Sequence, residues 1–388
     1  MVERVLAALA ELTPPAEVAA RLGLPAGPLC LRRAWPRSPE HLLLEYVGAD
    51  AEPVPGQWWA GRSAAERAVG AADPADVALV APGAAPGAVA LQLRGADPRL
   101  PGLAPLLRRP GARLLAHQPG RRAVVRLPEG DGAVFAKVVR PGRAEALAAA
   151  GAAANGLGGG AFATPRLLAI DARAGVVRWT ALAGVALHQL PAGPALVEGA
   201  RAAGRALRAL HEAAPPPQAR EHGPADERET LGRWAALAGA YDPATGAALA
   251  DLAAAVGEAL TATCGPLVTA HRDFYDKQIM VAEGARIGLL DFDTLARAEP
   301  ALDLANALVH FELRALQGLL AGDQAARARR ALCAGYDPAP AVQARLDAYA
   351  SAACLRLACV YSLRPRWRRC VAPLLDLARG PAPLLAAG

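Results

Sequence analysis

Residues 267–306 constrain the fold of this chain more than any other stretch. They read LVTAHRDFYDKQIMVAEGARIGLLDFDTLARAEPALDLAN. An apolar run ends in the triplet His271-Arg272-Asp273, a short polar turn follows, and two short strand-like segments then lead to Asp291. Carboxylates that end short apolar strands are held on rigid elements. We therefore expect the chain to fold so that Asp273 and Asp291 meet at one cleft.

Length and composition place broad limits on the protein. A chain of 388 residues with 53% hydrophobic residues is expected to form two or three packed units. No apolar run reaches the roughly 18 residues of a membrane span, so no membrane association is expected. The N-terminal sequence MVERVLAALAELTPP has an early Glu and too short an apolar stretch for a secretory signal. These features predict a cytoplasmic protein.

Charge and cysteine usage exclude some classes of partner. The net charge of +6 is modest for this length, and basic residues are not interleaved with aromatic ones, so a nucleic-acid partner is not expected. The six cysteines form no CxxC pair, which argues against a zinc site or a disulfide framework and favours buried thiols.

Lysine is rare in this chain, and its two positions are informative. All but two of the 42 basic residues are arginine, and the exceptions are Lys137 and Lys277. A compact ammonium and a planar guanidinium do different chemistry. Each lysine falls where a phosphate-binding lysine would be sought, although chance retention is the alternative.

The first 112 residues predict a small α+β unit in which we find no chemistry. Two short helices are expected within residues 1–22, and Trp35, Trp58 and Trp59 are interpreted as packing residues. Strand-like segments separated by Pro and Gly follow, at residues 29–35, 41–47, 57–60, 77–80 and 88–93.

Residues 113–185 predict a second unit of longer strands joined by tight turns. Expected strands cover residues 113–117, 123–127 and 133–139, and the last one contains Lys137. A lysine in an apolar strand needs a partner or a ligand, so its side chain is expected to point into a cleft. Glu145, near the start of the next helix, is the candidate partner. A favourable interaction with the helix dipole would explain Glu145 equally well.

Residues 186–388 are predicted to form a helical unit around the central stretch. His211 is interpreted as a packing or capping residue. Strands first and helices later are typical of two unlike lobes with a cleft between them. The expected helices cover residues 195–213, 230–240, 244–263, 302–320, 324–335, 341–361 and 366–379.

The order H-R-D, four residues, Q, and then an L-D-F segment resembles the aminoglycoside phosphotransferase family of the protein-kinase-like superfamily. The resemblance covers the chain from about residue 113 onward, and its specific part lies within residues 271–303. It implies a two-lobed kinase-like fold, preceded here by an extra N-terminal α+β region. It also implies ATP and Mg²⁺ as cofactors and a small-molecule hydroxyl as the acceptor.

The resemblance assigns roles by position. Asp273 falls on the catalytic aspartate, Asp291 on the magnesium aspartate and Lys137 on the strand lysine that contacts the α- and β-phosphates. Gln278 falls on the family's asparagine and offers the same amide oxygen, so it is expected to be a further metal ligand. Lys277 is expected to meet the transferring phosphate. The later Asp303 resembles an aspartate that steadies the catalytic loop.

Several positions depart from the wider kinase pattern. The first hairpin turn, HQPGRR, has one glycine, so phosphate contact there would depend on backbone N–H groups or on Arg121 and Arg122. Phe135 is bulkier than the alanine that protein kinases place there and would reshape an adenine pocket. Asp293 is a candidate second metal contact, although a solvated carboxylate is the preferred interpretation. Only ten residues separate Asp291 from Leu302, which favours a small-molecule acceptor over a protein.

The acceptor itself is left open by the sequence. From Ala339 onward the chain has seven Arg and two Asp, which favours a neutral or anionic acceptor such as a sugar, a nucleoside-like compound or a phosphorylated metabolite. A solvated basic face is the alternative explanation, and little activity on cationic aminoglycosides is expected.

Two other function classes remain. A nucleotide-binding pseudokinase with a regulatory or scaffolding role would account for Gln278 and the missing glycine loop. A metal-dependent hydrolase is disfavoured because the histidines have no metal-ligand spacing such as HExxH.

Overall fold

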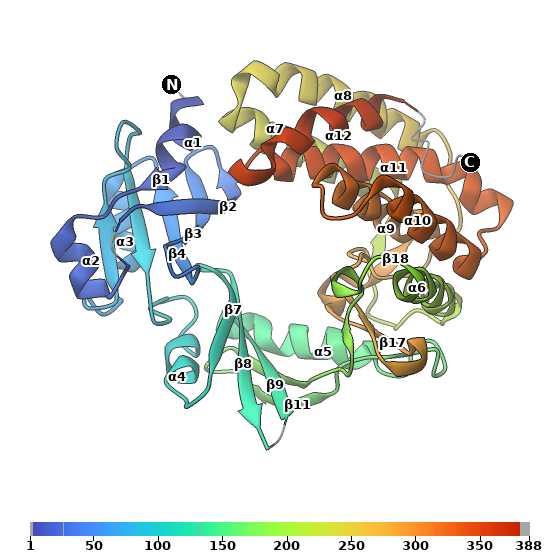
Figure 1. Cartoon of the computed structure of the whole chain (residues 1–388), viewed down its shortest axis with the longest axis horizontal. Helices are drawn as coiled ribbons and strands as arrows, with labels where there is room; N and C mark the ends of the chain where they lie inside the picture. The colour runs from blue at the N-terminus through green and yellow to red at the C-terminus, as the bar shows by residue number, and fades with distance from the viewer. Residues whose placement is uncertain (1–2, 26, 131, 381–388) are drawn as a thin grey trace.

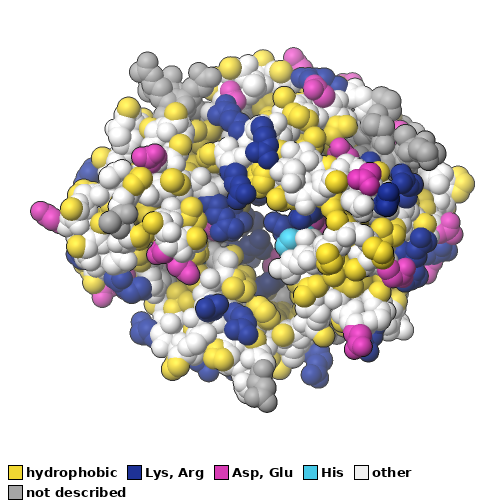
Figure 2. Space-filling model, viewed as in Figure 1, with side chains coloured by type: hydrophobic (Ala, Val, Ile, Leu, Met, Phe, Trp, Pro, Cys, Tyr) yellow, Lys and Arg dark blue, Asp and Glu magenta, His cyan; other side chains and the backbone are white. Residues whose placement is uncertain are grey.

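The computed structural model describes residues 3–25, 27–130 and 132–380. Three groups of elements are arranged in a ring (Figure 1): an N-terminal sheet with its helices, a second sheet, and a helical region. The space-filling view shows a central opening between them (Figure 2). The fold is mixed α+β, with strand-rich units in the first half of the chain and a helical region in the second, as expected.

The N-terminal unit is a six-stranded sheet in the order β1-β2-β3-β4-β6-β5. Its neighbouring strands are antiparallel. The two central strands β3 and β4 each bury five consecutive residues, including Tyr46 and Trp58. The strands are β1 (Glu11–Leu12), β2 (Leu29–Ser38), β3 (His41–Val47), β4 (Pro53–Trp59), β5 (Val77–Val80) and β6 (Ala88–Gln92). The helices are α1 (Glu3–Leu9), α2 (Ala16–Leu22) and α3 (Arg62–Val69).

The second unit is a five-stranded antiparallel sheet in the order β11-β12-β9-β8-β7. One face of this sheet buries Val125, Ala136 and Val138 against α4, so residues upstream of 113 contribute to its core. The strands are β7 (Arg113–Gln118), β8 (Arg122–Glu129), β9 (Gly132–Val139), β11 (Leu167–Asp171) and β12 (Val176–Thr180). The helices are α4 (Leu103–Leu107), the 3₁₀ turn η1 (Pro141–Arg143) and α5 (Ala144–Ala154).

The helical region contains two small sheets that carry the loops of the site. One has the order β10-β17-β16-β13 and the other β14-β18-β15. These strands are β10 (Phe162–Ala163), β13 (Val185–Ala186), β14 (Glu221–His222), β15 (Val268–Ala270), β16 (Ile279–Val281), β17 (Ile287–Leu289) and β18 (Ala296–Ala298). The α-helices are α6 (Pro194–Glu212), α7 (Pro224–Tyr241), α8 (Pro243–Thr261), α9 (Pro300–Leu316), α10 (Gly322–Tyr336), α11 (Pro340–Tyr361) and α12 (Val371–Arg379). The 3₁₀ turns are η2 (Leu187–Gln189), η3 (Glu283–Ala285), η4 (Phe292–Thr294) and η5 (Pro365–Cys370).

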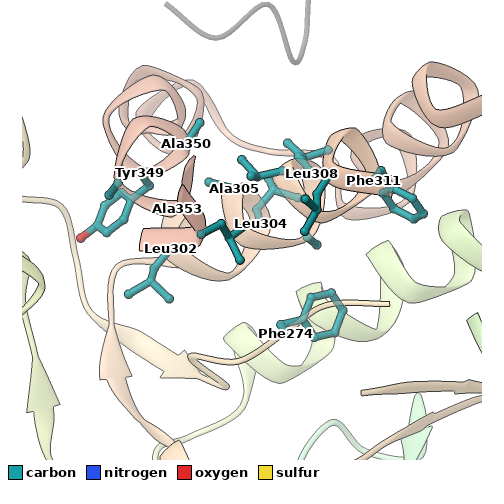
Figure 3. Close-up of a cluster of buried hydrophobic side chains, with 14 of the residues drawn as sticks. Phe274, Leu302, Leu304, Ala305, Leu308, Phe311, Tyr349, Ala350 and Ala353 are labelled. Atoms are coloured by element: carbon teal, nitrogen blue, oxygen red, sulfur yellow. The ribbon is translucent and has the colours of Figure 1, made fainter. Parts of the chain in front are cut away.

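The helical core holds the central stretch in place. Phe274, which follows Asp273, is fully buried, and Figure 3 shows it beside the α9 side chains Leu304, Leu308 and Phe311. Burying a large aromatic side chain of this kind stabilises the fold by roughly 1.5–3 kcal/mol. The loop that carries Asp273 is therefore anchored by packing as well as by hydrogen bonds.

The N-terminal unit docks on the helical region as well as on the second sheet. Tyr241 at the end of α7 and Leu363 after α11 belong to the hydrophobic core of the N-terminal unit. The Ala34 amide donates to the Leu363 carbonyl at 3.0 Å, and the Tyr241 hydroxyl donates to the Ser38 carbonyl. A shared core makes this contact part of the fold, so the three groups of elements close around the central opening (Figure 1).

The elements agree largely with the sequence-based expectations. Strands 41–47 and 77–80 and helix 144–154 have the expected bounds, and Trp58 is buried as expected. The structure also contains elements that were not expected. They are the helices α3 and α4 and the short strands β10, β13, β14, β15 and β18. No helix among the described residues is long and apolar enough to cross a bilayer, and all six cysteines are free thiols.

Candidate active site

The loop after β15 presents Asp273 in a strained backbone conformation. Arg272 has a φ of 66°, a left-handed value that is uncommon for a residue with a side chain. The buried Asp303 of α9 holds this conformation, because its carboxylate accepts from the amides of His271 and Arg272 at 2.7 Å each. Strain of this kind persists only where the surroundings fix it, and it is common at functional sites.

Asp303 belongs to a buried polar network. His211 Nε2 lies 3.2 Å from its Oδ2, and His211 Nδ1 lies 2.8 Å from the Tyr336 hydroxyl. Burial opposes ionisation, but the His211 contact and the other hydrogen bonds outweigh it and lower the pKa of Asp303. The steadying position expected for Asp303 and the packing position expected for His211 are both observed.

His271 connects the Asp273 loop to the Asp291 loop. Its Nε2 donates to the Leu290 carbonyl at 2.8 Å, and its Nδ1 accepts from the Asp273 amide at 3.3 Å. The ring also lies 4.7 Å from the Phe292 ring, centroid to centroid. The two loops that present Asp273 and Asp291 are therefore fixed relative to each other by one side chain.

Asp291 and Asp293 face Lys137 across the cleft. Lys137 Nζ of β9 lies 2.7 Å from Asp291 Oδ1 and 2.6 Å from Asp293 Oδ1. The Lys137 and Asp291 side chains are only 20% and 19% exposed, so water screens this contact weakly. Glu145, the expected partner of Lys137, is instead exposed in the first turn of α5. Asp293 is likewise ion-paired rather than free in solvent.

The pKa values of Asp291 and Asp293 are shifted in opposite directions. Burial opposes ionisation, but Lys137 and Arg122 outweigh it and lower the pKa of Asp291 to about 2. Burial and the neighbouring Asp291 charge raise the pKa of Asp293. Arg122 Nη1 lies 3.9 Å from Asp291 and 3.7 Å from Asp293. Asp291 is thus the carboxylate that stays ionised over the whole physiological range.

Asp273 and Gln278 lie on the same side of the cleft. Gln278 Nε2 is 3.4 Å from Asp273 Oδ2 and 3.5 Å from the Tyr275 hydroxyl. The Gln278 carbonyl accepts from the Leu290 amide, which places the residue beside the Asp291 loop. Burial raises the pKa of Asp273 to about 6. A carboxylate with such a pKa is suited to accept a proton near neutral pH.

A cavity of about 270 Å³ joins these groups to an apolar compartment. Phe135, Trp179 and Leu182 line one part of it, while Lys137 and Asp291 line the other. Gly151 on α5 has no room for a side chain, because a Cβ there would lie 2.2 Å from the Trp179 ring. An apolar slot ending in charged groups suits a planar base with attached phosphates. The remaining lining residues are Val124, Pro165, Thr180, Gln278, Met280, Leu290, Phe292 and Asp293.

The donor set at the charged end fits a magnesium ion bound together with phosphates. Among residues 3–25, 27–130 and 132–380, no three His, Cys, Asp or Glu side chains converge as a complete protein cage. Mg²⁺ commonly takes one or two carboxylates and completes its shell with water and substrate phosphates. Asp291, Asp293 and the Gln278 amide oxygen are the groups available for this purpose.

The β7–β8 turn above the charged end is tied down by Asp97. Buried Asp97 Oδ2 accepts from the Gly120 amide at 2.6 Å and contacts His117 Nε2 at 2.9 Å. Arg121 Nη1 bonds to Gln118 within the turn, whereas Arg122 reaches toward the two aspartates. The turn is therefore held by a carboxylate from the segment between β6 and α4 rather than by several glycines.

Lys277 precedes Gln278 in the chain but does not line the cavity. Partial desolvation and the charges of Arg364 and Arg33 lower its pKa, while Asp276 raises it. Neither Arg364 nor Arg33 lines the 270 Å³ cavity. The structure therefore separates the two lysines, with Lys137 in the cavity and Lys277 in a second, basic region.

Sequence reasoning missed Asp97 and preferred the wrong environment for Asp293, whereas Arg122 was named as a phosphate contact. Asp97, Arg122 and Asp293 lie far apart in the chain, and no spacing rule links them. The signal for Asp293 was its place two residues after Asp291, which puts both carboxylates near one turn. For Asp97 the sequence gives no signal.

Comparisons with known proteins were made for the whole chain. The phosphotransferase enzyme family matches residues 112–342. No curated protein gives a significant match. Among solved structures, the chain is similar to a spectinomycin phosphotransferase in complex with ADP and spectinomycin (12% identity, 69% of this chain and 88% of that chain, TM-score 0.48). It is also similar to an aminoglycoside phosphotransferase from Streptomyces rimosus (22%, 62% and 93%, TM-score 0.45) and to a Plasmodium vivax ethanolamine kinase (11%, 70% and 82%, TM-score 0.49).

Proposed function

Because this chain belongs to the phosphotransferase enzyme family, we propose that it transfers the γ-phosphoryl group of ATP to a hydroxyl of a small molecule. The observation that carries the proposal is the contact of Lys137 with Asp291 and Asp293 in a cavity that is also lined by Gln278, whose amide lies 3.4 Å from Asp273. Lysine and carboxylates opposed in this way suit a phosphate chain and its metal ion.

Each side chain then has a defined part in the reaction. The acceptor hydroxyl hydrogen-bonds to Asp273, which takes the proton as the new P–O bond forms. The bond between the γ-phosphorus and the β–γ bridging oxygen breaks, and ADP leaves with the electron pair. Lys137 and Arg122 bind phosphate oxygens, and Trp179 and Phe135 hold the base. Magnesium, when bound by Asp291 and Gln278, supplies positive charge to the phosphates.

A small-molecule acceptor is supported by the short connection after Asp291. Residues 292–299 form η4 and β18 and lead directly into α9 at Pro300. A protein kinase uses a longer segment at this point to position its protein substrate. The short connection leaves no comparable platform.

A nucleotide-binding pseudokinase is the second candidate, and Gln278 favours it. The Gln278 amide nitrogen, rather than its oxygen, faces Asp273 at 3.4 Å. A hydrogen bond that occupies the base would reduce its ability to accept a proton.

Phosphate transfer to pooled metabolites distinguishes the two. The protein is incubated with ATP, Mg²⁺ and a pool of sugars, sugar phosphates, uronic acids and nucleosides, and products are detected by mass spectrometry. The proposal predicts one product class heavier by one phosphoryl group, absent with Asp273→Ala. Nucleotide binding without any such product would favour the pseudokinase, and product formation unchanged by Asp273→Ala would remove the mechanism.

A further inference from the structure

The central opening of the molecule is lined by basic side chains. Figure 2 shows Lys and Arg side chains gathered around a hollow where the N-terminal unit, the second sheet and the helical region meet. Acidic side chains on this face lie mostly away from the hollow (Figure 2). A concave surface lined by one sign of charge concentrates ligands of the opposite charge.

The basic side chains nearest Asp273 come from three separate segments. Arg33 lies on β2 of the N-terminal unit, Lys277 follows the catalytic loop, and Arg364 lies between α11 and η5. They are close enough to interact: beyond its partial desolvation, Lys277 has its pKa lowered by Arg364 and Arg33. The Ala34–Leu363 hydrogen bond holds the β2 and Arg364 segments together. We call Arg33, Lys277 and Arg364 the basic cluster.

Two members of this cluster lack a neutralising partner. Arg33 is paired with buried Glu45 at 2.8 Å. Within the described ranges of the chain, neither Lys277 nor Arg364 has a carboxylate within 4.0 Å. The buried Arg364 Nε also has no hydrogen-bond partner there. The Arg364 guanidinium carbon lies 4.4 Å from the centroid of the Tyr361 ring, so one face of the guanidinium is covered and its Nε–H is left for an acceptor.

The basic cluster borders the catalytic base. Tyr275, two residues after Asp273, stacks on His310 with ring centroids 4.3 Å apart. Burial, Arg356, Lys277 and Arg364 all lower the pKa of His310, so this ring stays neutral between the cations. Charges from Asp273 and Arg364 both act on Tyr275. Gln278 Nε2 lies 3.4 Å from Asp273 Oδ2 and 3.5 Å from the Tyr275 hydroxyl, so the aromatic pair lies beside the catalytic base.

We propose that the acceptor carries an anionic group, phosphate or carboxylate, which Arg364 and Lys277 bind while the acceptor hydroxyl faces Asp273. Arg33 closes the wall from the N-terminal unit, which gives the first 112 residues a part in substrate selection. This assignment rests on the proposed function. Guanidinium and ammonium groups are the usual protein partners of phosphate and carboxylate oxygens.

Calorimetric titration with hexose 6-phosphate, hexuronate and the parent hexose tests the proposal on the full chain saturated with ADP and Mg²⁺. Saturation removes binding of the probe at the nucleotide end. The two anions are expected to bind saturably and at least tenfold more tightly than the hexose. The ratio of the two affinities identifies phosphate or carboxylate as the preferred group. Equal affinities for all three probes, or binding of none, would overturn the proposal.

Two variants with one matched control locate the site. Arg364→Gln and Lys277→Gln are expected to weaken anion binding about tenfold or more and to leave ADP binding unchanged. Arg366→Gln removes an exposed arginine from the same segment, where it lies over Trp367, and is expected to change neither. Wild-type anion affinity in both Arg364→Gln and Lys277→Gln would overturn the assignment. If the wild-type protein did not bind ADP at all, the proposed function itself would be contradicted. Failure of the anion site and failure of the proposed function are therefore distinguishable.

Discussion

The two ends of the cleft differ in charge: one has matched acidic and basic side chains, and the other has an excess of basic ones. One end is the cavity proposed to bind the nucleotide, and we call it the nucleotide end. There Lys137 is matched by Asp291 and Asp293 at 2.7 and 2.6 Å. In the basic cluster Arg364 and Lys277 have no carboxylate within 4.0 Å among the described residues. Balanced charge suits a ligand that arrives with its own cation, as a magnesium nucleotide does. Unbalanced positive charge suits a ligand that arrives as an anion.

Under the proposed function, this difference gives the two lysines different roles. A lysine in the balanced end can exchange its carboxylate partners for phosphates when the metal ion binds to those carboxylates. A lysine in the unbalanced end has no partner to exchange and can only gain one. The same side chain therefore serves two functions, set by whether acids surround it.

The largest expected effect is at the junction of the two ends. Asp273→Ala should lower turnover by roughly 10²–10⁴-fold, because it removes the proton acceptor. ADP affinity should not change, since Asp273 does not line the 270 Å³ cavity. Steady-state kinetics and calorimetry measure the two quantities. Asp323→Ala, which removes an exposed carboxylate on α10, is the control and should leave both unchanged.

The next effect separates the two lysines. Lys137→Ala should raise the KM for ATP by roughly 10–100-fold, the loss of a charge-assisted contact. Lys277→Ala should raise the KM for the acceptor and leave the KM for ATP unchanged. Measuring the KM for ATP and the KM for the acceptor in both variants tests directly whether the two lysines act on different ligands. A parallel rise of both KM values in either variant would show that the ends are not separate.

The pH dependence should report the base at the junction. Burial raises the pKa of Asp273 to about 6, and only its deprotonated form can accept the hydroxyl proton. The value of kcat/KM should therefore fall about tenfold per pH unit below pH 6 and level off above it. Glutamate at this position would shift both reach and pKa, so Asp273→Glu should change the profile. A flat profile between pH 5 and 7 would contradict the role of Asp273.

The smallest expected effect is at the β7–β8 turn. Asp97→Ala leaves the Gly120 amide and buried His117 without a partner, a loss of about 1–3 kcal/mol. The melting temperature should fall, and the KM for ATP should rise severalfold because the turn above the phosphates loosens. Asp97→Asn keeps one acceptor and should lie between. An unchanged KM for ATP in a variant with a lowered melting temperature would show that the turn does not contact the nucleotide.

Local sequence pattern predicts much of the fold and the main site residues. Strand 41–47 is a short, mostly apolar run bounded by turn residues, so its bounds follow from the chain itself. The family resemblance found in residues 271–303 is confirmed. The contact between Lys137 and Asp291 could be anticipated as a shared cleft, because a buried lysine needs an anion. The direct ion pair could not, because it joins residues 154 positions apart.

The sequence pattern did not predict the directions in which side chains point. Glu145 is the first acid after Lys137 in the sequence, but it faces solvent on α5 while Asp293 approaches from another unit. The contact of the N-terminal unit with the helical region depends on Tyr241 and Leu363, which look like ordinary core residues. The basic cluster forms only because this contact brings Arg33 toward Arg364.

Anomalous diffraction from crystals soaked with Mn²⁺, ADP and bromide tests the two-ended cleft most directly. The account predicts a manganese peak between Asp291 and Gln278 and a bromide peak between Lys277 and Arg364. Crystals of Arg364→Gln should keep the first peak and lose the second. Bromide spread over exposed arginines with none in the basic cluster, or manganese away from Asp291, would contradict it.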